Sequence, residues 1–103
     1  MKKLFISQPM RDKTEEQIFQ ERDRAIIAAS KDLGEEVELI DTYITEDPPE
    51  VSNQEIWYLG KSLILLAQAD IAYFVKGWKD YRGCKCEHKA AIEYNIPVII
   101  EDE

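Results

Sequence analysis

The sequence predicts a doubly wound α/β domain built on a four-stranded parallel sheet. Short apolar runs alternate with longer amphipathic segments, in the order β-α-β-α-β-α-β. Strands separated by helices form parallel sheets through right-handed crossovers. The 103 residues suffice for one such domain and are too few for two. We therefore expect a single domain over residues 1–103, with strand order 2-1-3-4.

The first two expected elements are a short strand and a long helix. Residues 4–6 form an apolar run that is typical of a buried strand. Thr14 precedes Gln17 by three residues, which is a capping-box pattern at a helix start. Apolar side chains then recur at helical spacing up to Gly34, which suits a left-handed C-cap. The pattern predicts a helix over 14–33.

A second strand and helix follow, with a long loop between them. Residues 37–40 are expected to form the strand, and 42–51 show neither helical nor strand periodicity. A loop of this length in a small domain is often a lid or a binding element. Ser52 and Glu55 repeat the capping-box spacing, so the second helix is expected from Ser52 to Ala69.

The last elements complete the alternating pattern. Residues 71–75 are almost continuously apolar, which suits a central parallel strand. A loop at 76–83 precedes a third helix at 84–94, which Asn95 would end in a left-handed conformation. Residues 97–100 form the last expected strand. The whole is expected to be flavodoxin-like or Rossmann-like.

Charge and cysteine content exclude several classes of protein. Thirteen basic and 21 acidic residues give a net charge of −8, so we expect no nucleic acid and no membrane as partner. The apolar runs are too short to span a bilayer. Two cysteines one residue apart cannot join distant segments, which favours a reducing, cytoplasmic location. The acidic tail, 101–103, is expected to be solvated.

Doubly wound sheets bind ligands beyond the carboxyl ends of their strands, near the switch point between the first and third strands. The loop after the first strand offers Ser7, Gln8 and Arg11 there. Arg11 can pair with a phosphate or a carboxylate, although a solvated loop arginine is the simpler alternative. No glycine-rich dinucleotide-binding or P-loop motif is present, and we expect no cofactor.

The loop after the third strand is unusually basic. Five of the thirteen basic residues lie between Lys76 and Lys89, and Gly77 and Gly83 flank Trp78. Glycines permit tight backbone paths and expose the amides at a helix start to an anion, while tryptophan offers a flat face for stacking. These features favour an anionic small molecule. The alternatives are an ordinary charged surface and a packed tryptophan.

Glu87 is the main catalytic candidate. It lies near the start of the third helix, where the helix dipole and nearby basic side chains are expected to favour its ionised form. An ionised, positioned carboxylate can act as a nucleophile at an anomeric carbon. Asp70 and Asp80 are candidates for a second carboxyl group that assists the leaving group. Accidental pairing is the alternative in a chain with 21 acidic residues.

Cys84, Cys86 and His88 do not form a metal-binding pattern on a helix. Residues two apart point about 200° from one another, and no further cysteine or histidine completes a ligand set. We therefore expect no metal. Cys84 and His88 lie on one helical face and are expected to pack the helix, with a Cys–His nucleophile as a minor alternative.

Two stretches of the chain resemble the nucleoside 2-deoxyribosyltransferase-like superfamily. The first is LFISQPMR at 4–11, and the second is ADIAYFVKGW at 69–78 followed by RGCKCEHKAA at 82–91. The similarity spans nearly the whole chain and is greatest to a short phage and bacterial branch of unknown function. Characterised members transfer 2-deoxyribose between bases or hydrolyse the N-glycosidic bond of deoxynucleoside monophosphates.

The resemblance implies roles for individual residues. Glu87 matches the nucleophilic glutamate of the family, and Asp70 matches an aspartate that shapes the sugar or base site. Asp80 lies one position from the second aspartate of the family. Ser7 and Arg11 match positions near the sugar or the 5′-phosphate. The substrate-binding candidates are Ser7, Gln8, Arg11, Gly77, Trp78 and Gly83.

The leading hypothesis is an enzyme that cleaves the N-glycosidic bond of (deoxy)nucleosides or their 5′-monophosphates, or that transfers the deoxyribosyl group. Glu87 would attack C1′, and Trp78 would stack on the base. A non-catalytic protein that binds or sequesters a nucleotide is the alternative, and an interaction module acting through the acidic segment 41–50 is a third. Because so short a chain leaves few residues to enclose a ligand, we expect it to pair with itself.

Overall fold

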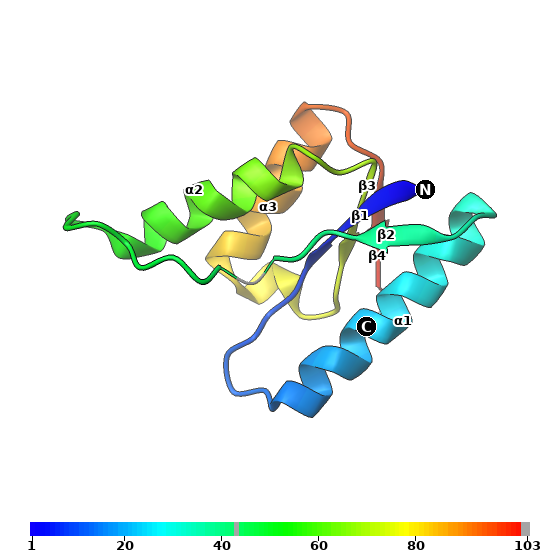
Figure 1. The fold of residues 1–103 in the computed structure, drawn as a ribbon, viewed down its shortest axis with the longest axis horizontal. Helices are drawn as coiled ribbons and strands as arrows, with labels where there is room; N and C mark the ends of the chain where they lie inside the picture. Colours follow the sequence, from blue (N-terminus) through cyan, green and yellow to red (C-terminus); the bar gives the residue numbers. More distant parts are fainter. Residues whose placement is uncertain (43, 102–103) are drawn as a thin grey trace.

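The computed structural model describes residues 1–42 and 44–101 and has the predicted architecture. The elements, in chain order, are β1 (Lys2–Ser7), α1 (Glu15–Leu33), β2 (Val37–Leu39), α2 (Gln54–Leu66), β3 (Ile71–Phe74), the 3₁₀ helix η1 (Trp78–Asp80), α3 (Arg82–Glu93) and β4 (Val98–Ile100). The strands form one parallel sheet in the order β2-β1-β3-β4, as predicted. Helix α1 covers one face of the sheet, and α2 and α3 cover the other (Figure 1).

Alternating side chains of the central strands divide the core into two layers. Phe5 and Phe74 pack against α2 and α3 in one layer. Leu4 and Tyr73 pack against α1 in the other. Each fully buried side chain of this size stabilises the fold by about 1.5–3 kcal/mol. Since β1 and β3 contribute such side chains to both layers, these two strands hold all three helices to the sheet.

The register of β1 and β3 defines two opposite edges of the sheet. Ser7 lies opposite Phe74, and the Val75 amide donates to the Ser7 carbonyl at 3.0 Å. The loops after both strands therefore leave from the same carboxyl edge. At the amino edge, the backbone amide of Lys3 donates to the carboxylate of Asp70 at 2.8 Å.

Local capping explains where the helices begin and end. Thr14 and Gln17 form the predicted capping box of α1, and Gly34 adopts the expected left-handed C-cap with φ of 70°. Asn53, rather than Ser52, caps α2, because its side-chain oxygen accepts from the Ile56 amide at 2.9 Å.

Two further helix boundaries differ from the sequence prediction by two residues or more. Helix α2 ends at Leu66 instead of Ala69, because the amides of Gln68 and Ala69 bond back three residues and tighten the chain into a turn. Helix α3 begins at Arg82, two residues earlier than predicted. Asn95 has the predicted left-handed conformation, with φ of 62°. Among the described residues, no helix has both the length and the apolar character that a membrane span requires.

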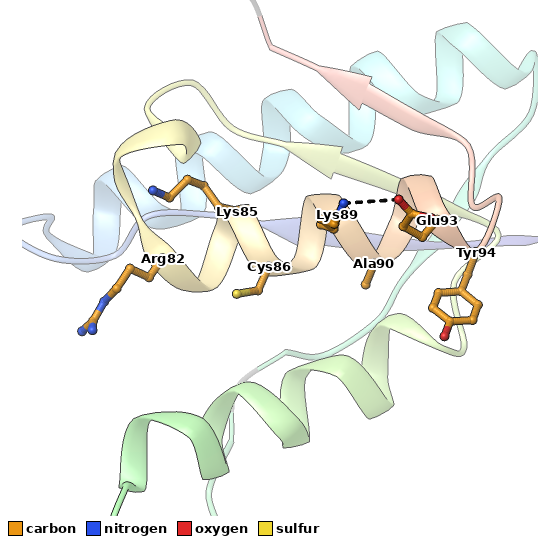
Figure 2. A pocket seen from close by; sticks show the side chains of 7 residues that line it. All are labelled: Arg82, Lys85, Cys86, Lys89, Ala90, Glu93 and Tyr94. Carbon is orange, nitrogen blue, oxygen red and sulfur yellow. Dashed lines mark hydrogen bonds and ion pairs between the residues drawn. The ribbon is translucent and has the colours of Figure 1, made fainter.

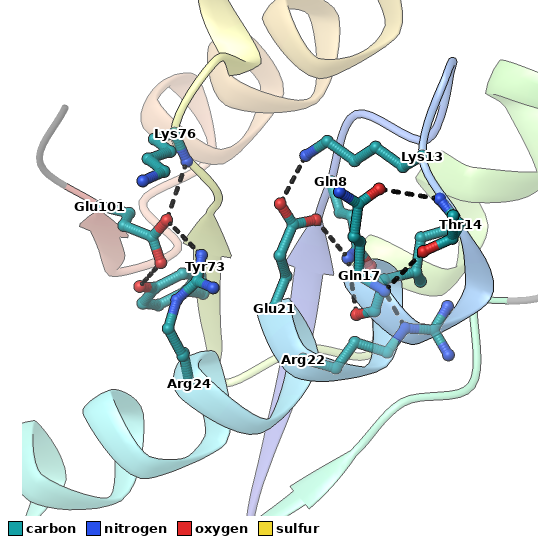
Figure 3. Close-up of polar contacts among 11 residues, drawn as sticks. Gln8, Lys13, Thr14, Gln17, Glu21, Arg22, Arg24, Tyr73, Lys76 and Glu101 are labelled. Atoms are coloured by element: carbon teal, nitrogen blue, oxygen red, sulfur yellow. Dashed lines mark hydrogen bonds and ion pairs between the residues drawn. The ribbon is translucent and has the colours of Figure 1, made fainter.

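Glu101 corrects the expectation of a solvated tail. Its carboxylate accepts hydrogen bonds from Arg24 at 2.9 Å, from the Tyr73 hydroxyl at 2.5 Å and from the Lys76 amide at 3.4 Å (Figure 3). Burial raises the pKa of Glu101, but these hydrogen bonds outweigh burial and hold the pKa below its ordinary value. The chain after β4 is thereby tied to α1 and β3. Residues 102 and 103 lie outside the described residues.

Glu101→Gln should lower the free energy of unfolding at neutral pH by about 1 kcal/mol or less, because the half-exposed Arg24 partner is screened by solvent. Since the pKa of Glu101 is lowered by folding, its contribution is present above the ordinary glutamate pKa and is lost as pH falls through the folded pKa. Urea unfolding at neutral and acidic pH measures this. Glu93→Gln, in the exposed pair with Lys89, is the control, and an equal loss in both variants would contradict the assignment.

Candidate functional site

A cavity of about 240 Å³ lies beyond the carboxyl end of β1, next to α2. Its lining comes from β1, from the loops after β1 and β2, from α2 and from α3. It consists of Ile6, Gln8, Met10, Thr42, Ile44, Tyr58, Leu59, Ser62 and Glu87. We call it the Glu87 cavity. This is the edge at which doubly wound sheets bind ligands, and β1 is the strand from which the sheet extends in both directions.

Glu87 supplies the carboxyl group of this cavity and is only 7% exposed. The hydroxyl of Ser7 donates to Oε1 at 2.7 Å, and the hydroxyl of Ser62 donates to Oε2. One oxygen is therefore held from β1 and the other from α2, while the carboxyl group itself comes from α3. This arrangement fixes the direction of the carboxyl group toward the cavity.

The structure corrects the expected ionisation of Glu87. Because α3 begins at Arg82, Glu87 lies in the second helical turn, where the influence of the helix dipole has largely decayed. Among the described residues, no lysine or arginine lines the cavity beside the carboxyl group. Burial raises the pKa of Glu87, and the hydrogen bonds from Ser62 and Ser7 offset burial only in part. The site therefore favours the protonated acid more than water does.

Cys84 lies one turn before Glu87 and touches the same serine. Burial raises the pKa of the Cys84 thiol, hydrogen bonding with Ser7 lowers it, and the nearby Glu87 charge raises it further. The thiol belongs to the core layer beneath α3, as predicted. His88 also packs as predicted, with its ring stacked on Trp78 at 4.3 Å between centroids. Within residues 1–42 and 44–101, no cluster of three potential metal ligands occurs.

Gln8 lines the cavity, but both ends of its side-chain amide are engaged elsewhere. The nitrogen donates to Glu21 and to the Ile18 carbonyl, each at 3.0 Å, and the oxygen accepts from Arg22 at 3.2 Å (Figure 3). Lys13 adds an ion pair to Glu21 at 2.5 Å. This network ties the loop after β1 to α1 and thereby positions one wall of the Glu87 cavity.

A neighbouring hollow of about 360 Å³ brings Arg11 and Gly83 close to the site. It shares Leu59 with the Glu87 cavity. Arg11 is exposed and makes no hydrogen bond or ion pair with any residue that the structure describes. A side chain added at Gly83 would meet no atom within 4 Å, so this glycine keeps the hollow open.

The structure does not bring Asp70 or Asp80 to Glu87. Asp70 precedes β3 and therefore lies at the amino edge of the sheet, bonded to the Lys3 amide. Ser7 lies four positions after Lys3 along β1, which is about 13 Å of strand. Asp80 is at the carboxyl edge, but it is exposed in η1 and does not line the Glu87 cavity.

Trp78 and Gly77 also take structural positions away from the Glu87 cavity. Trp78 is 8% exposed and packs against Phe74 and His88, which corrects its expected availability for stacking on a base. Its apolar ring fills the core layer beneath α3. Gly77 has φ of 91°, a conformation that L side chains rarely adopt, and it lets the chain turn beside Pro9.

Three polar residues of the cavity were not predicted from the sequence: Ser62, Tyr58 and Thr42. Ser62 lies on the face of α2 that carries Leu59 and Leu66, between apolar neighbours. A hydroxyl on the inward-facing side of a helix requires a hydrogen-bond partner. This requirement could have indicated from the sequence that Ser62 contacts a polar group inside the fold. Tyr58 lies on α2 and Thr42 lies in the loop after β2, and local sequence patterns do not determine how either segment packs over the cavity.

No family model, curated protein or solved structure matches this chain. The site is therefore interpreted from its own chemistry. It combines a buried, oriented carboxyl group with an apolar wall and, in the adjoining hollow, an arginine that pairs with none of the described residues. Such an arrangement can hold a small molecule and present an oxygen nucleophile or acid to it.

Glu87→Gln should raise the free energy of unfolding at neutral pH. The folded protein loses stability as pH rises from the ordinary glutamate pKa of 4.5 through the raised pKa of Glu87, and glutamine removes this loss. Each pH unit of upward shift corresponds to about 1.4 kcal/mol. Thermal unfolding across pH measures the difference, which should vanish below the ordinary pKa.

Ser62→Ala is the matched variant for this measurement. It removes a donor to the charged form of Glu87, so it should raise the pKa further and lower stability at neutral pH by about 1–3 kcal/mol. A Glu87→Gln protein that is less stable than the wild type at neutral pH, with the same pH dependence, would contradict the assigned ionisation.

Proposed function

We propose that this chain cleaves the N-glycosidic bond of (deoxy)nucleosides or their 5′-monophosphates, or transfers the deoxyribosyl group to another base. The observation that carries the proposal is the oriented carboxyl group of Glu87 at the wall of a cavity on the carboxyl edge. The same residue matches the nucleophilic glutamate of the nucleoside 2-deoxyribosyltransferase-like superfamily, which the sequence resembles. We propose membership of that superfamily together with the activity.

The proposed reaction proceeds in two displacements at C1′. Ionised Glu87 forms a bond from one carboxylate oxygen to C1′ while the C1′–N bond breaks, and the base departs with the electron pair and takes up a proton from water. Water or a nitrogen of a second base then attacks C1′ and loses a proton, and the carboxylate recovers its electron pair. The transition state resembles an oxocarbenium ion, which a nearby carboxylate stabilises.

The two serines support this role because they act on both the direction and the charge of Glu87. Hydrogen bonds from Ser7 and Ser62 favour the ionised form, which is the form that can attack. Burial opposes ionisation, so activity should fall as pH drops through a pKa above the ordinary glutamate value. A carboxylate in a shielded cavity also acts more strongly on developing positive charge than one in water.

A nucleotide-binding protein without turnover is the second candidate. The observation in its favour is the placement of Asp70 and Asp80, since neither lies beside Glu87 to assist a leaving base. Binding of a nucleotide that raises the unfolding temperature, without release of base, would support this candidate.

Base release from deoxynucleosides and their 5′-monophosphates tests the enzymatic proposal. The wild type should release base, and Glu87→Ala should be slower by at least about a hundredfold, because the attacking and charge-stabilising group is removed. Glu93→Gln on the exposed side of the same helix should retain the wild-type rate. The proposal fails if the wild type releases no base, or if Glu87→Ala releases it equally fast.

Arg11→Ala tests whether the adjoining hollow receives a 5′-phosphate. Arg11 is exposed and has no partner among the described residues, which leaves it available to an anion. Its loss should therefore raise KM for monophosphates about tenfold, which corresponds to one charge-assisted hydrogen bond. KM for the unphosphorylated nucleosides should not change. Lys2→Ala, at the opposite edge of the sheet, is the charge-matched control, and an equal effect on both substrate classes would count against the phosphate site.

A further inference from the structure

One carboxyl group on α1 holds both ends of the loop that follows β1. Oε1 of Glu21 accepts from the side-chain amide of Gln8 at 3.0 Å, and Oε2 accepts from the ammonium group of Lys13 at 2.5 Å (Figure 3). Glu21 is only 8% exposed, so these contacts are largely shielded from water. We call residues 8–13 the clamped loop.

The side-chain amide of Gln8 can take only one orientation in this contact. Its nitrogen donates to Glu21 and to the Ile18 carbonyl, and its oxygen accepts from Arg22. The reversed amide would put its oxygen against two acceptors and its nitrogen against a donor. The start of the clamped loop is therefore fixed relative to α1 in direction as well as in distance.

Only a carboxylate can serve both ends of the clamped loop. An ionised carboxyl group accepts hydrogen bonds on both oxygens, whereas an amide accepts on its oxygen and donates from its nitrogen. In Glu21→Gln, an N–H group would face either Gln8 or Lys13, and both of these side chains act as donors here. The residue type at position 21 is thus specific to its two partners.

The middle of the clamped loop is a tight turn with a strained residue. The Lys13 amide donates to the Met10 carbonyl at 3.3 Å, which closes a turn over residues 10–13. Asp12 has φ of 62°, a left-handed conformation that is uncommon for residues other than glycine. Such a conformation persists where the surrounding structure holds it in place. The bonds from Glu21 to both ends of the loop supply this support.

The turn carries two residues of the candidate site. Met10 lines the Glu87 cavity, and Arg11 lines the adjoining hollow of about 360 Å³. Ser7, which precedes the clamped loop, is the last residue of β1 and is held by pairing with β3. We therefore expect Glu21 to control the position of Arg11 and to leave the hydrogen bond between Ser7 and Glu87 intact.

The hollow contains a second arginine, but that side chain already has a partner. Arg82 points from the start of α3 toward the start of α2 (Figure 2), where its guanidinium pairs with Glu55 at 2.5 Å. Arg11 makes no hydrogen bond or ion pair with any residue that the structure describes. The position of Arg11 therefore decides whether the hollow offers an available positive charge to an anion.

We propose that Glu21 is a positioning residue, which acts through Gln8 and Lys13 to keep Arg11 at the hollow beside the Glu87 cavity. Glu21 itself belongs to α1, which covers the opposite face of the sheet from α2 and α3 (Figure 1). It lines neither the hollow nor the cavity, so its effect on a bound anion is indirect. That the anion is the 5′-phosphate of a nucleotide rests on the proposed function, whereas the clamp itself does not.

Hydrogen exchange measured by NMR tests the clamp itself. In Glu21→Gln, the Lys13 amide that closes the turn should exchange at least about tenfold faster than in the wild type, which corresponds to the loss of one hydrogen bond to a charged group. The amides of β1 should keep their wild-type rates, because the pairing of the sheet is unchanged. Glu16→Gln is the matched control, since Glu16 is exposed on the same helix, and this variant should leave the Lys13 amide unchanged.

Lys13→Met is a second variant, which releases only one end of the clamped loop. The side chain of Lys13 is 22% exposed against 10% for Glu21, so its loss should disturb the interior less. The amide at position 13 should exchange faster than in the wild type, but by a smaller factor than in Glu21→Gln, because Gln8 keeps its bond to Glu21. Circular dichroism should show wild-type helix content in both variants.

Steady-state kinetics test the effect of the clamp on Arg11. Glu21→Gln should raise KM for deoxynucleoside 5′-monophosphates about tenfold, as Arg11→Ala does, and should leave KM for the unphosphorylated nucleosides unchanged. The kcat value and its pH profile should stay near those of the wild type, because Glu87 keeps both serines. Adding Arg11→Ala to Glu21→Gln should raise KM no further, since both changes remove the same contact. Loss of stability alone would not separate the two substrate classes.

Three results would overturn the proposal. Wild-type exchange of the Lys13 amide in Glu21→Gln would show that the turn does not depend on Glu21. A further tenfold rise in KM in the double variant would show that Glu21 and Arg11 act independently. An equal rise in KM for both substrate classes would show a general loosening of the site.

A wild type that releases no base would refute the proposed enzymatic function and not the clamp. The exchange rates would then still decide whether Glu21 holds the turn. Dissociation constants for a deoxynucleoside 5′-monophosphate and for its nucleoside would take the place of KM, with the same expected difference between the two ligands.

Discussion

The carboxyl group of Glu87, with a serine hydroxyl on each oxygen, is the interaction on which the carboxyl edge of this molecule depends. It joins three elements that are far apart in sequence, since Ser7 comes from β1, Ser62 from α2 and Glu87 from α3. A buried carboxyl group without such partners would cost several kcal/mol. Satisfying it therefore requires all three elements to be in place together, and this requirement gives the cavity a defined wall.

The same contact shows how burial and hydrogen bonding compete at the site. Burial has the larger effect and raises the pKa of Glu87, whereas the two serines act in the opposite direction. A nucleophile at C1′ must be ionised, so the serines would sustain the proposed reaction as well as orient the carboxyl group.

Sequence patterns were sufficient for the fold because the information that defines it is local. Alternating apolar periods, the capping box at Thr14 and the left-handed residues Gly34 and Asn95 predicted the elements, and the crossover rule predicted the strand order. The candidate site was predicted only in part. Glu87 and Ser7 meet because both positions follow from strand and helix order. Ser62 was missed because its role depends on the rotation of α2 about its axis, which periodicity in an almost uniformly apolar helix does not define.

Asp70 and Trp78, which lie away from Glu87 in the structure, illustrate a second reason why the site was predicted only in part. Asp70 precedes a parallel strand and must lie at the amino edge, so proximity in sequence to a site loop does not place it in the site. Trp78 lies in the correct loop, but a large aromatic ring gains more from packing against Phe74 and His88 than from exposure. Apolar burial therefore decides which loop residues remain available. Arg11 has no hydrogen bond or ion pair to any described residue, and its charged guanidinium gains little from apolar packing, so it remains available to an anion.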